Sequence, residues 1–244
     1  MRQMTDLRTS EPLHERVYSH LCDALMRGEF VPAERLTLRG LAEDLGTSIA
    51  PVREAVSRLA TLNAVDVFPK RFIEVAPLSA ETYMEIVEIR QLLEGHAAAR
   101  ACLNMTGDQI DKLEQTNRRL LEFAADGQVS RSMIENQRFH FAIYEAAGSD
   151  ALLENIKQVW IRVGPSVNQL LTEEYSQDTS GLHAGFANHE KLITAFRKGD
   201  TQSATTAIVD DIGISSERML RNLKRQSELS LTTLEAVSGR SNNS

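Results

Sequence analysis

The sequence has no apolar run approaching the roughly 20 residues that a membrane-spanning helix needs, and no secretory signal opens it. Only two cysteines occur in the 244 residues, Cys22 and Cys102, and both fall in segments whose apolar spacing predicts helices. Disulfides form in oxidising compartments, and small disulfide-linked domains are far richer in cysteine. We therefore expect a cytoplasmic protein with two free core thiols and no membrane partner.

The sequence also lacks the motifs of common enzyme classes. It contains no phosphate-binding loop and no serine or cysteine in a nucleophile setting. Di-iron helical bundles need repeated Glu-x-x-His spacings on facing helices, and the one such spacing here, Glu11 to His14, lies beside Pro12 and outside the predicted bundle. The sequence therefore predicts that the protein is not an enzyme.

The strongest positive pattern lies in residues 36–62, which predict two short helices joined by a tight turn. Thr37 is placed to cap the first helix, and Gly46 follows its end. Ser48 is placed to cap the second helix, and Pro51 falls in its first turn, where the missing N–H has no intrahelical partner to lose. This arrangement predicts a helix-turn-helix motif.

The second of these helices has an apolar face and an opposite, more polar face. The apolar stripe, which we expect to be buried, consists of Val52, Ala55, Val56 and Leu59. The opposite face carries Ile49, Arg53 and Ser57. Helix-turn-helix proteins place their base-reading side chains near the start of the second helix, so this face is a candidate DNA-reading surface.

Residues 65–75 predict two short β-segments on either side of Pro69, with Lys70 and Arg71 at the tip. A helix-turn-helix followed by a basic-tipped hairpin describes a winged helix. The whole chain has a net charge of −7, but residues 35–71 carry a net charge of +2. This modest concentration of positive charge predicts salt-sensitive binding to double-stranded DNA.

The stretch PAERLTLRGLAEDLGTSIAPVREAVSRLATLNAV, and its PVREA run above all, resembles the DNA-binding domain of GntR-type bacterial transcription regulators. The resemblance implies that Arg39 and Arg53 contact DNA. Ile49 stands where many relatives carry another arginine, and Phe72 replaces the usual wing glycine, so we expect an operator and a wing that depart from the common pattern. The candidate DNA-binding residues are Arg39, Thr47, Ser48, Ile49, Arg53, Lys70 and Arg71.

The pattern as a whole predicts a mainly α protein of two domains. Residues 1–77 are expected to form an N-terminal winged helix-turn-helix domain, and residues 78–226 an all-α helical-bundle effector domain after a hinge at 76–79. Residues 227–244 are rich in Ser, Thr and Asn, and we expect a disordered tail there. Residues 29–35, which contain Pro32, are expected to be a connection to the helix-turn-helix. Within the bundle, Gly164-Pro165 predicts a kink or a break in a helix, Trp160 is expected in the core, and the next helix is expected over 184–198 after a polar loop.

Four polar residues are placed to converge inside this bundle. Asn136 and His140 are four residues apart and therefore share one helix face. His189 lies ten residues before Gly199, and Asp211 lies twelve after it. In a helical hairpin about that glycine, both lie roughly 15–18 Å from the turn. Because a buried histidine without a partner is costly, we expect the four side chains to meet.

Three further segments, EIRQLLEGHAAARA, NQRFHFAIYEAAGSDALLENI and HEKLITAFRKGDTQSA, resemble the effector-binding domain of the FadR-like branch of the same family. Many members of that branch bind a divalent metal through an Asp and a His four apart and through a His on each side of the last hairpin turn. This sequence matches at His140 and His189 and departs at Asn136 and Asp211. The resemblance implies a divalent transition metal at these four residues, Zn²⁺ first and Ni²⁺ or Mn²⁺ otherwise. A metal-free polar pocket is the alternative.

Arg90 occupies the position where these relatives place an arginine on the first helix of the domain. The resemblance implies that its guanidinium binds an effector carboxylate through two parallel hydrogen bonds. A surface or interface salt bridge with Glu94, four residues further along the same helix, is the alternative.

Together these patterns predict a homodimeric transcription regulator, specifically a repressor, whose binding to a double-stranded DNA operator is controlled by a small carboxylate effector. No cofactor other than the metal is expected. Two alternatives from other classes stay open, a helical metalloenzyme and a structural DNA-binding protein without a ligand. Bound metal or a bound metabolite in the purified protein would count against the second of these.

Overall fold

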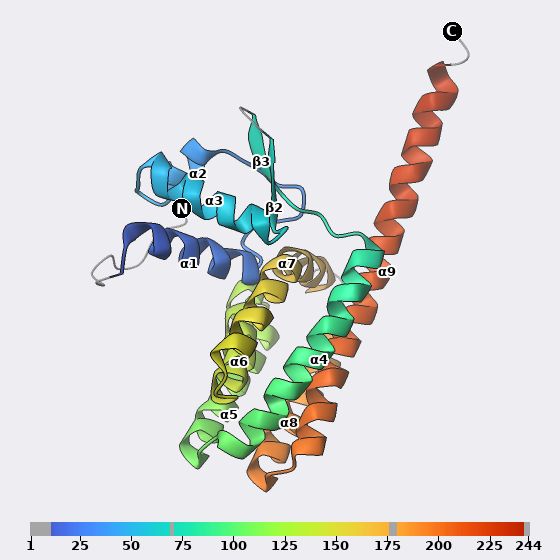
Figure 1. Ribbon diagram of the computed structural model, residues 1–244. Coiled ribbons are helices and arrows are strands. Elements are labelled where there is room, and N and C mark those ends of the chain that lie inside the picture. The colour runs from blue at the N-terminus through green and yellow to red at the C-terminus, as the bar shows by residue number, and fades with distance from the viewer. Residues whose placement is uncertain (1–10, 69–70, 176–179, 242–244) are drawn as a thin grey trace.

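The computed structural model describes the backbone of residues 11–68, 71–175 and 180–241, and the side chains of 11–68, 71–167 and 187–225. The chain begins with a small domain of helices and short strands. Its elements are α1 (Leu13–Met26), β1 (Arg35–Leu36), α2 (Leu38–Asp44), α3 (Ile49–Thr61), β2 (Val65–Phe68) and β3 (Phe72–Val75). This is the predicted winged helix, with α2 and α3 as the helix-turn-helix and the β2–β3 hairpin as the wing (Figure 1).

Local chemistry explains why the helix-turn-helix forms where it does. The Thr37 side chain accepts a hydrogen bond from the Gly40 N–H at 3.0 Å, which caps α2 as predicted. Gly46 follows with φ of 62°, a left-handed conformation that glycine adopts without strain. Ser48 precedes α3 but its side chain makes no capping bond. The apolar stripe of α3 is buried as predicted.

The sheet contains a strand that the sequence did not predict. β1 pairs antiparallel with β3, with Arg35 opposite Glu74, and β3 also pairs with β2, so the strand order is β1-β3-β2. Residues 29–35 were expected to be a plain connection. Two residues carry too little pattern to predict a strand, and their extended conformation depends on pairing with a segment almost 40 positions away.

The second domain is a bundle of helices, as predicted. Its elements are α4 (Ala80–Asn104), α5 (Gly107–Ala125), α6 (Val129–Ala146), α7 (Asp150–Tyr175), α8 (Ser180–Lys198) and α9 (Thr201–Ser241). Figure 1 shows α4 and α9 running side by side along one edge of the bundle, with α9 continuing well past the other helices. The chain is therefore mainly α, with its only described strands in the winged helix.

Helix ends in the bundle follow from short-range hydrogen bonds. The Ser79 hydroxyl accepts from the Thr82 N–H at 3.1 Å and starts α4 directly after the linker. Thr106 and Gln109 form a reciprocal capping box at the start of α5. Gly199, with φ of 67°, makes the tight turn between α8 and α9 that the sequence predicted.

Three details of the bundle bear on its predicted helix bounds. α7 continues through Pro165 as one helix, so of the predicted kink or break there is no break, and the kink stays a prediction. α8 begins at Ser180, before the predicted start at 184, and residues 176–179 of the predicted loop lie outside the described residues. α9 runs to Ser241, although 227–244 were expected to be a disordered tail. No glycine or proline occurs between 214 and 238 to end that helix, so its composition alone was a poor guide.

The two domains share one hydrophobic core. A single cluster of buried side chains extends from Val17 and Leu25 of α1 to Trp160 of α7 and Ile208 of α9. Cys22 and Cys102 are both buried and free, as predicted. In the described part of the chain, no helix is both long and apolar enough to cross a membrane.

Candidate functional site

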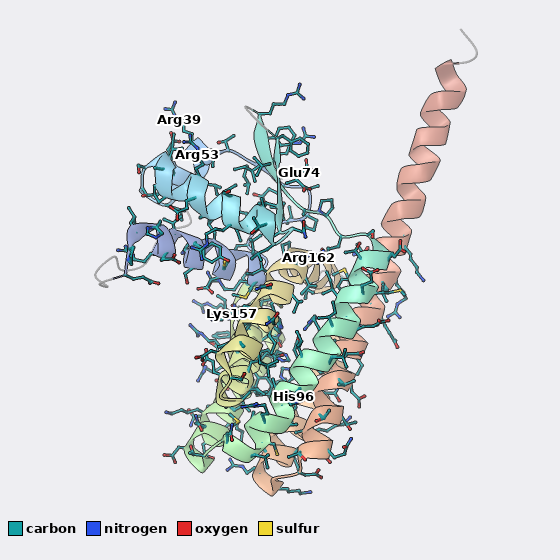
Figure 2. The ribbon with its side chains drawn as sticks, in the orientation of Figure 1. Arg39, Arg53, Glu74, His96, Lys157 and Arg162 are labelled. Atoms are coloured by element: carbon teal, nitrogen blue, oxygen red, sulfur yellow. The ribbon has the colours of Figure 1, made fainter. Side chains whose placement is uncertain are left out.

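The outer face of the winged helix carries the predicted DNA-reading residues. Arg53 and Ile49 are both exposed on α3, and Ile49 keeps 40% of its surface accessible although it is apolar. Arg39 on α2 is 83% exposed, and its Nε donates to Glu43 Oε1 at 2.9 Å. Figure 2 shows Arg39 and Arg53 on the side of this domain that faces away from the bundle. A DNA duplex can therefore approach both arginines.

The wing presents a cation held on stacked aromatic rings. Phe68 and Phe72 stack with ring centroids 4.6 Å apart, and the Arg35 guanidinium lies 4.4 Å from the centroid of Phe72. Arg35 also bonds Glu74 at 3.2 Å. The sequence analysis overlooked Arg35, because its place beside the wing depends on β1. Arg71 is exposed near the tip as predicted, and Lys70 lies outside the described residues.

The turn before α3 contains two of the predicted DNA-contacting residues, Thr47 and Ser48. Ser48 is exposed, so its hydroxyl can reach a phosphate. The Thr47 hydroxyl oxygen is buried and has no hydrogen-bond partner among the described residues. The Thr47 N–H donates to Ala42 O at 2.9 Å, which closes the turn after α2. Thr47 is thus a structural residue of this turn in the structure, and its hydroxyl does not face outward as expected.

The second site is a cluster of three side chains from three helices of the bundle. His140 of α6, His189 of α8 and Asp211 of α9 each offer one ligand atom, and these atoms lie within 4.8 Å of one another. His140 Nε2 is 3.5 Å from Asp211 Oδ2, and His189 Nε2 is 3.9 Å from Asp211 Oδ1. Both histidines are buried, and the Asp211 side chain is 13% exposed. The structure thus brings together three of the four residues that the sequence analysis singled out.

Asn136, the fourth residue, lies half-buried on α6, one helical turn before His140. Its position on the helix matches the expectation. Asparagine has an amide where the resembling family has a carboxylate, and an amide oxygen is a weaker ligand because it carries no charge.

A hydrogen bond to a fourth helix fixes the ring of His189. Its Nδ1 lies 2.9 Å from Oδ1 of Asn117 on α5. An amide oxygen can only accept, so the proton of the neutral imidazole is on Nδ1. The lone pair of His189 is therefore on Nε2, the atom that faces Asp211.

A similar chain of hydrogen bonds fixes the ring of His140. Tyr144 donates its hydroxyl proton to Oε2 of Glu94, so its oxygen accepts from His140 Nδ1 at 3.2 Å. The His140 proton is therefore also on Nδ1, and its Nε2 lone pair faces Asp211. Metal-binding histidines are oriented in the same way, by partners of the ring nitrogen that does not bind the metal.

The ionisation of the cluster favours neutral histidines. Burial lowers the pKa of His140 well below its usual value, and it lowers the pKa of His189 to about 3. Burial also raises the pKa of Asp211 to about 7. When Asp211 is ionised, the cluster holds three acceptor atoms with no proton between them; these repel one another, and a cation removes that repulsion. The donor set of two imidazoles and a carboxylate therefore fits a divalent transition metal.

The geometry agrees with this chemistry. Ligand atoms about 2.1 Å from a tetrahedral zinc lie about 3.4 Å apart. The separation of His140 Nε2 from Asp211 Oδ2 is 3.5 Å, that of His189 Nε2 from Asp211 Oδ1 is 3.9 Å, and all three ligand atoms lie within 4.8 Å, so a small inward shift would complete the geometry. A protonated Asp211 shared with one imidazole is the metal-free arrangement of the same atoms.

Arg90 does not face an open pocket, as an effector clamp was expected to do. It is buried, and its Nε and Nη2 bond Glu94 at 2.7 and 3.4 Å. Glu94 is fully buried and also accepts from Tyr144 and from Trp160 Nε1, the latter at 3.0 Å. The i+4 ion pair offered as the alternative for Arg90 is therefore present, but it is buried in the core and not at the surface as that alternative had it. A buried charge needs such a partner, which is why the guanidinium is already occupied.

Sequence reasoning missed the residues that support the cluster, namely Glu94, Asn117, Tyr144 and Trp160. Tyr144 follows His140 by four positions, so its presence on the same face was readable from the spacing. Asn117 and Trp160 come from α5 and α7, and no spacing relates those helices to α6. Trp160 was expected only to be a core residue, and it does lie in the core.

Comparison with known protein families divides the chain into the same two domains, the winged helix and the helical bundle. The model of the FCD domain matches residues 85–213, and the model of bacterial regulatory proteins of the gntR family matches residues 13–75. These two segments coincide with the helical bundle and the winged helix.

Individual relatives match most of the chain. The HTH-type transcriptional regulator McbR of Escherichia coli K12 is 30% identical over 195 residues, which are 80% of this chain and 87% of that protein. The HTH-type transcriptional repressor GlaR of the same organism is 24% identical over 77% of this chain and 87% of its own length. The solved structure of E. coli McbR/YncC superposes with a TM-score of 0.78 at 29% identity and covers 89% of this chain and 99% of that one. The chain therefore belongs to the gntR family of bacterial transcription regulators, with an FCD domain after its DNA-binding domain.

Proposed function

We propose that this regulator is a homodimeric repressor whose operator binding is controlled by a small carboxylate effector bound at a divalent metal in the FCD domain. The observation that carries the proposal is the convergence of His140 Nε2, His189 Nε2 and an Asp211 oxygen, with both ring protons directed away from the centre. Repression is supported by the relative GlaR, which is named a repressor.

His140, His189 and Asp211 would hold the metal, with Asn136 as a weak fourth oxygen ligand or an outer partner. A divalent ion with one carboxylate ligand keeps about one net positive charge and open coordination positions, and so attracts an anion. Zn²⁺ suits two imidazoles and a carboxylate best, and Ni²⁺ or Mn²⁺ are the next choices.

A surface groove supports a route to this centre. It lies between α5 and α8, has a volume of about 520 Å³, and is lined by Asn117, the partner of His189. Arg118, Arg197 and Lys198 also line it, together with Glu114 and Glu190, and Glu114 forms ion pairs with both Arg118 and Arg197.

Two connections lead from the cluster to the DNA-binding domain. α4 carries the Glu94 network and follows the wing through the linker at 76–79. α7 carries Trp160, whose indole bonds Glu94, and one turn further on Gly164 contacts α1. An effector that binds one arrangement of α4 and α7 more tightly than another shifts the population toward that arrangement, by no more than the difference between its two affinities. The shift changes the spacing of the two DNA-reading helices of the dimer.

The test begins with selection of duplexes from a random pool by the purified zinc-loaded protein. A recovered duplex is then titrated with wild-type protein and with the His140→Ala/His189→Ala variant, in the presence of a panel of organic and sugar acids. We expect at least one acid to weaken wild-type binding tenfold or more and to leave the variant unchanged. Equal effects of every acid on both proteins would place the effector elsewhere. Failure to recover any duplex would contradict the proposal that the zinc-loaded protein binds an operator.

A further inference from the structure

One face of α4 carries an exposed stripe along the whole length of the helix. Its members recur at intervals of four, four, three, four, four and three residues, which keeps them on one side of an α-helix. The stripe consists of Glu81, Glu85, Ile89, Leu92, His96, Arg100 and Leu103, and every one of them is exposed. Ile89 is 45% exposed and Leu92 is 75% exposed, unusually high for large apolar side chains at the centre of a helix.

The other sides of α4 are covered. Gly95 packs on Val209 and Thr205 of α9, with an added Cβ only 3.3 and 3.4 Å from their side chains. Arg90 and Glu94 point into the bundle and are buried. The stripe is therefore the one side of α4 that the described part of this chain leaves uncovered, and Figure 2 shows His96 on it, away from α9.

The charges of the stripe are ordered along the helix. Two glutamates occupy its N-terminal part and two apolar residues its centre. Its C-terminal part holds His96, Leu103 and Arg100, and the Arg100 guanidinium also donates to the Ala147 and Gly148 carbonyls of the same chain at 2.9 and 3.3 Å. A second copy of the same helix, turned by a two-fold axis between Arg90 and Gln91, reverses this order. Glu81 then meets Arg100 of the copy, Glu85 meets His96, and Ile89 meets Leu92. A two-fold interface must be self-complementary in this way.

We infer that the stripe on α4 is the surface on which a second copy of this chain binds, with the two α4 helices antiparallel. The inference rests on the homodimer of the proposed function and identifies its contact surface. Apolar residues at the centre and opposite charges at both ends match the anatomy of protein interfaces. α4 then carries the Glu94 network on its inner side and the partner on its outer side, so one helix links the polar cluster to the spacing of the two subunits.

The first test compares two leucine substitutions by sedimentation velocity of full-length protein over a range of concentrations. Leu92→Glu places a charge at the centre of the stripe, and we expect its dimer dissociation constant to rise at least tenfold. Leu13→Glu makes the same change at an exposed leucine of α1 and serves as the matched control, with a wild-type dissociation constant expected. Circular dichroism checks that both variants are folded.

The second test addresses the antiparallel register. Glu85→Lys and His96→Glu should each weaken the dimer, whereas the double variant restores opposite charges at both ends of the two-fold contact. We expect it to recover most of the wild-type affinity.

The outcomes separate this inference from the proposed function. A Leu92→Glu protein that remains as dimeric as wild type would place the interface elsewhere and leave the homodimer standing. A double variant without recovery would overturn the antiparallel register. A wild-type protein that is monomeric at micromolar concentration, with and without DNA, would overturn both the surface and the homodimer.

Discussion

Gly164 of α7 lies so close to the end of α1 that a Cβ added to it would be 2.3 Å from the carbonyl oxygen of Leu25. The same atom would lie 2.8 Å from Cα of Met26. The FCD domain and the DNA-binding domain therefore meet backbone against backbone at this point, without an intervening side chain. A backbone contact cannot be relieved by a change of rotamer, so movement of α7 at this residue is transmitted to α1.

Gly164→Ala should separate the two helices and destabilise the protein by about 1–3 kcal/mol, the usual cost of overpacking. Urea unfolding followed by circular dichroism measures the loss. Gly213→Ala is the control, since its Cβ would meet only a Gln91 side-chain nitrogen at 3.9 Å. Alanine in that helix should stabilise by about 0.5–1 kcal/mol. Equal stability of the Gly164→Ala protein and wild type would show that the contact is not tight.

Arg53→Ala should weaken operator binding by about 1–3 kcal/mol if the guanidinium bonds a base. The measurement is fluorescence anisotropy of a selected duplex at fixed salt. Arg221→Ala removes an equally mobile cation, 70% exposed on α9, and should bind like wild type because it lies outside the winged helix. Operator affinity unchanged in the Arg53 variant would remove this residue from the DNA contact.

Asn117→Ala should lower zinc affinity by roughly 10- to 100-fold without removing a metal ligand. Without the Asn117 oxygen, the His189 ring loses the partner that keeps its proton on Nδ1. Competition with a chromophoric chelator gives the affinity. Asn155→Ala, whose amide bonds only the Ala151 carbonyl in an exposed stretch of α7, is the matched control. Zinc binding as tight as in wild type would show that Asn117 does not position the ring.

Glu94→Leu should destabilise the protein by about 3–5 kcal/mol, because it leaves the buried Arg90 charge without its partner. Arg90→Met combined with Glu94→Leu removes both charges and should cost less than the single change. The free energies of unfolding in urea, measured for both variants, test the order. A double variant less stable than the single one would mean that Arg90 is stabilised by something other than Glu94.

The sequence predicted most of the fold because most of the elements are encoded locally. Thr37, Pro51 and the apolar stripe of α3 specify the helix-turn-helix within a few residues. The convergence of His140, His189 and Asp211 was predictable because two simple relations place them, a helical turn and the symmetry of a hairpin about Gly199.

Other features depend on contacts that no local pattern encodes. β1 exists through pairing with β3, and the Asn117 and Trp160 contacts depend on how α5 and α7 are rotated against α6. Arg90 was assigned to an effector by position in a resembling family, whereas its orientation is decided by the buried Glu94 carboxylate. Whether a charged side chain is buried depends on the packing of the whole bundle. A separation of four residues along a helix is compatible with both an exposed and a buried ion pair, so the sequence could not distinguish the two.

Trp160 is the only tryptophan in the sequence, and its ring centroid lies 5.4 Å from that of His140. Its indole N–H bonds Glu94, which in turn bonds the tyrosine that orients His140. Ultraviolet emission excited at the indole band therefore comes from a single fluorophore beside the three-residue cluster. Paramagnetic Ni²⁺ or Mn²⁺ at His140 would quench this emission, while Zn²⁺ would shift it without quenching. The native chain thus contains its own optical probe of occupancy, and a label-free titration can follow the cluster in the intact, DNA-bound protein.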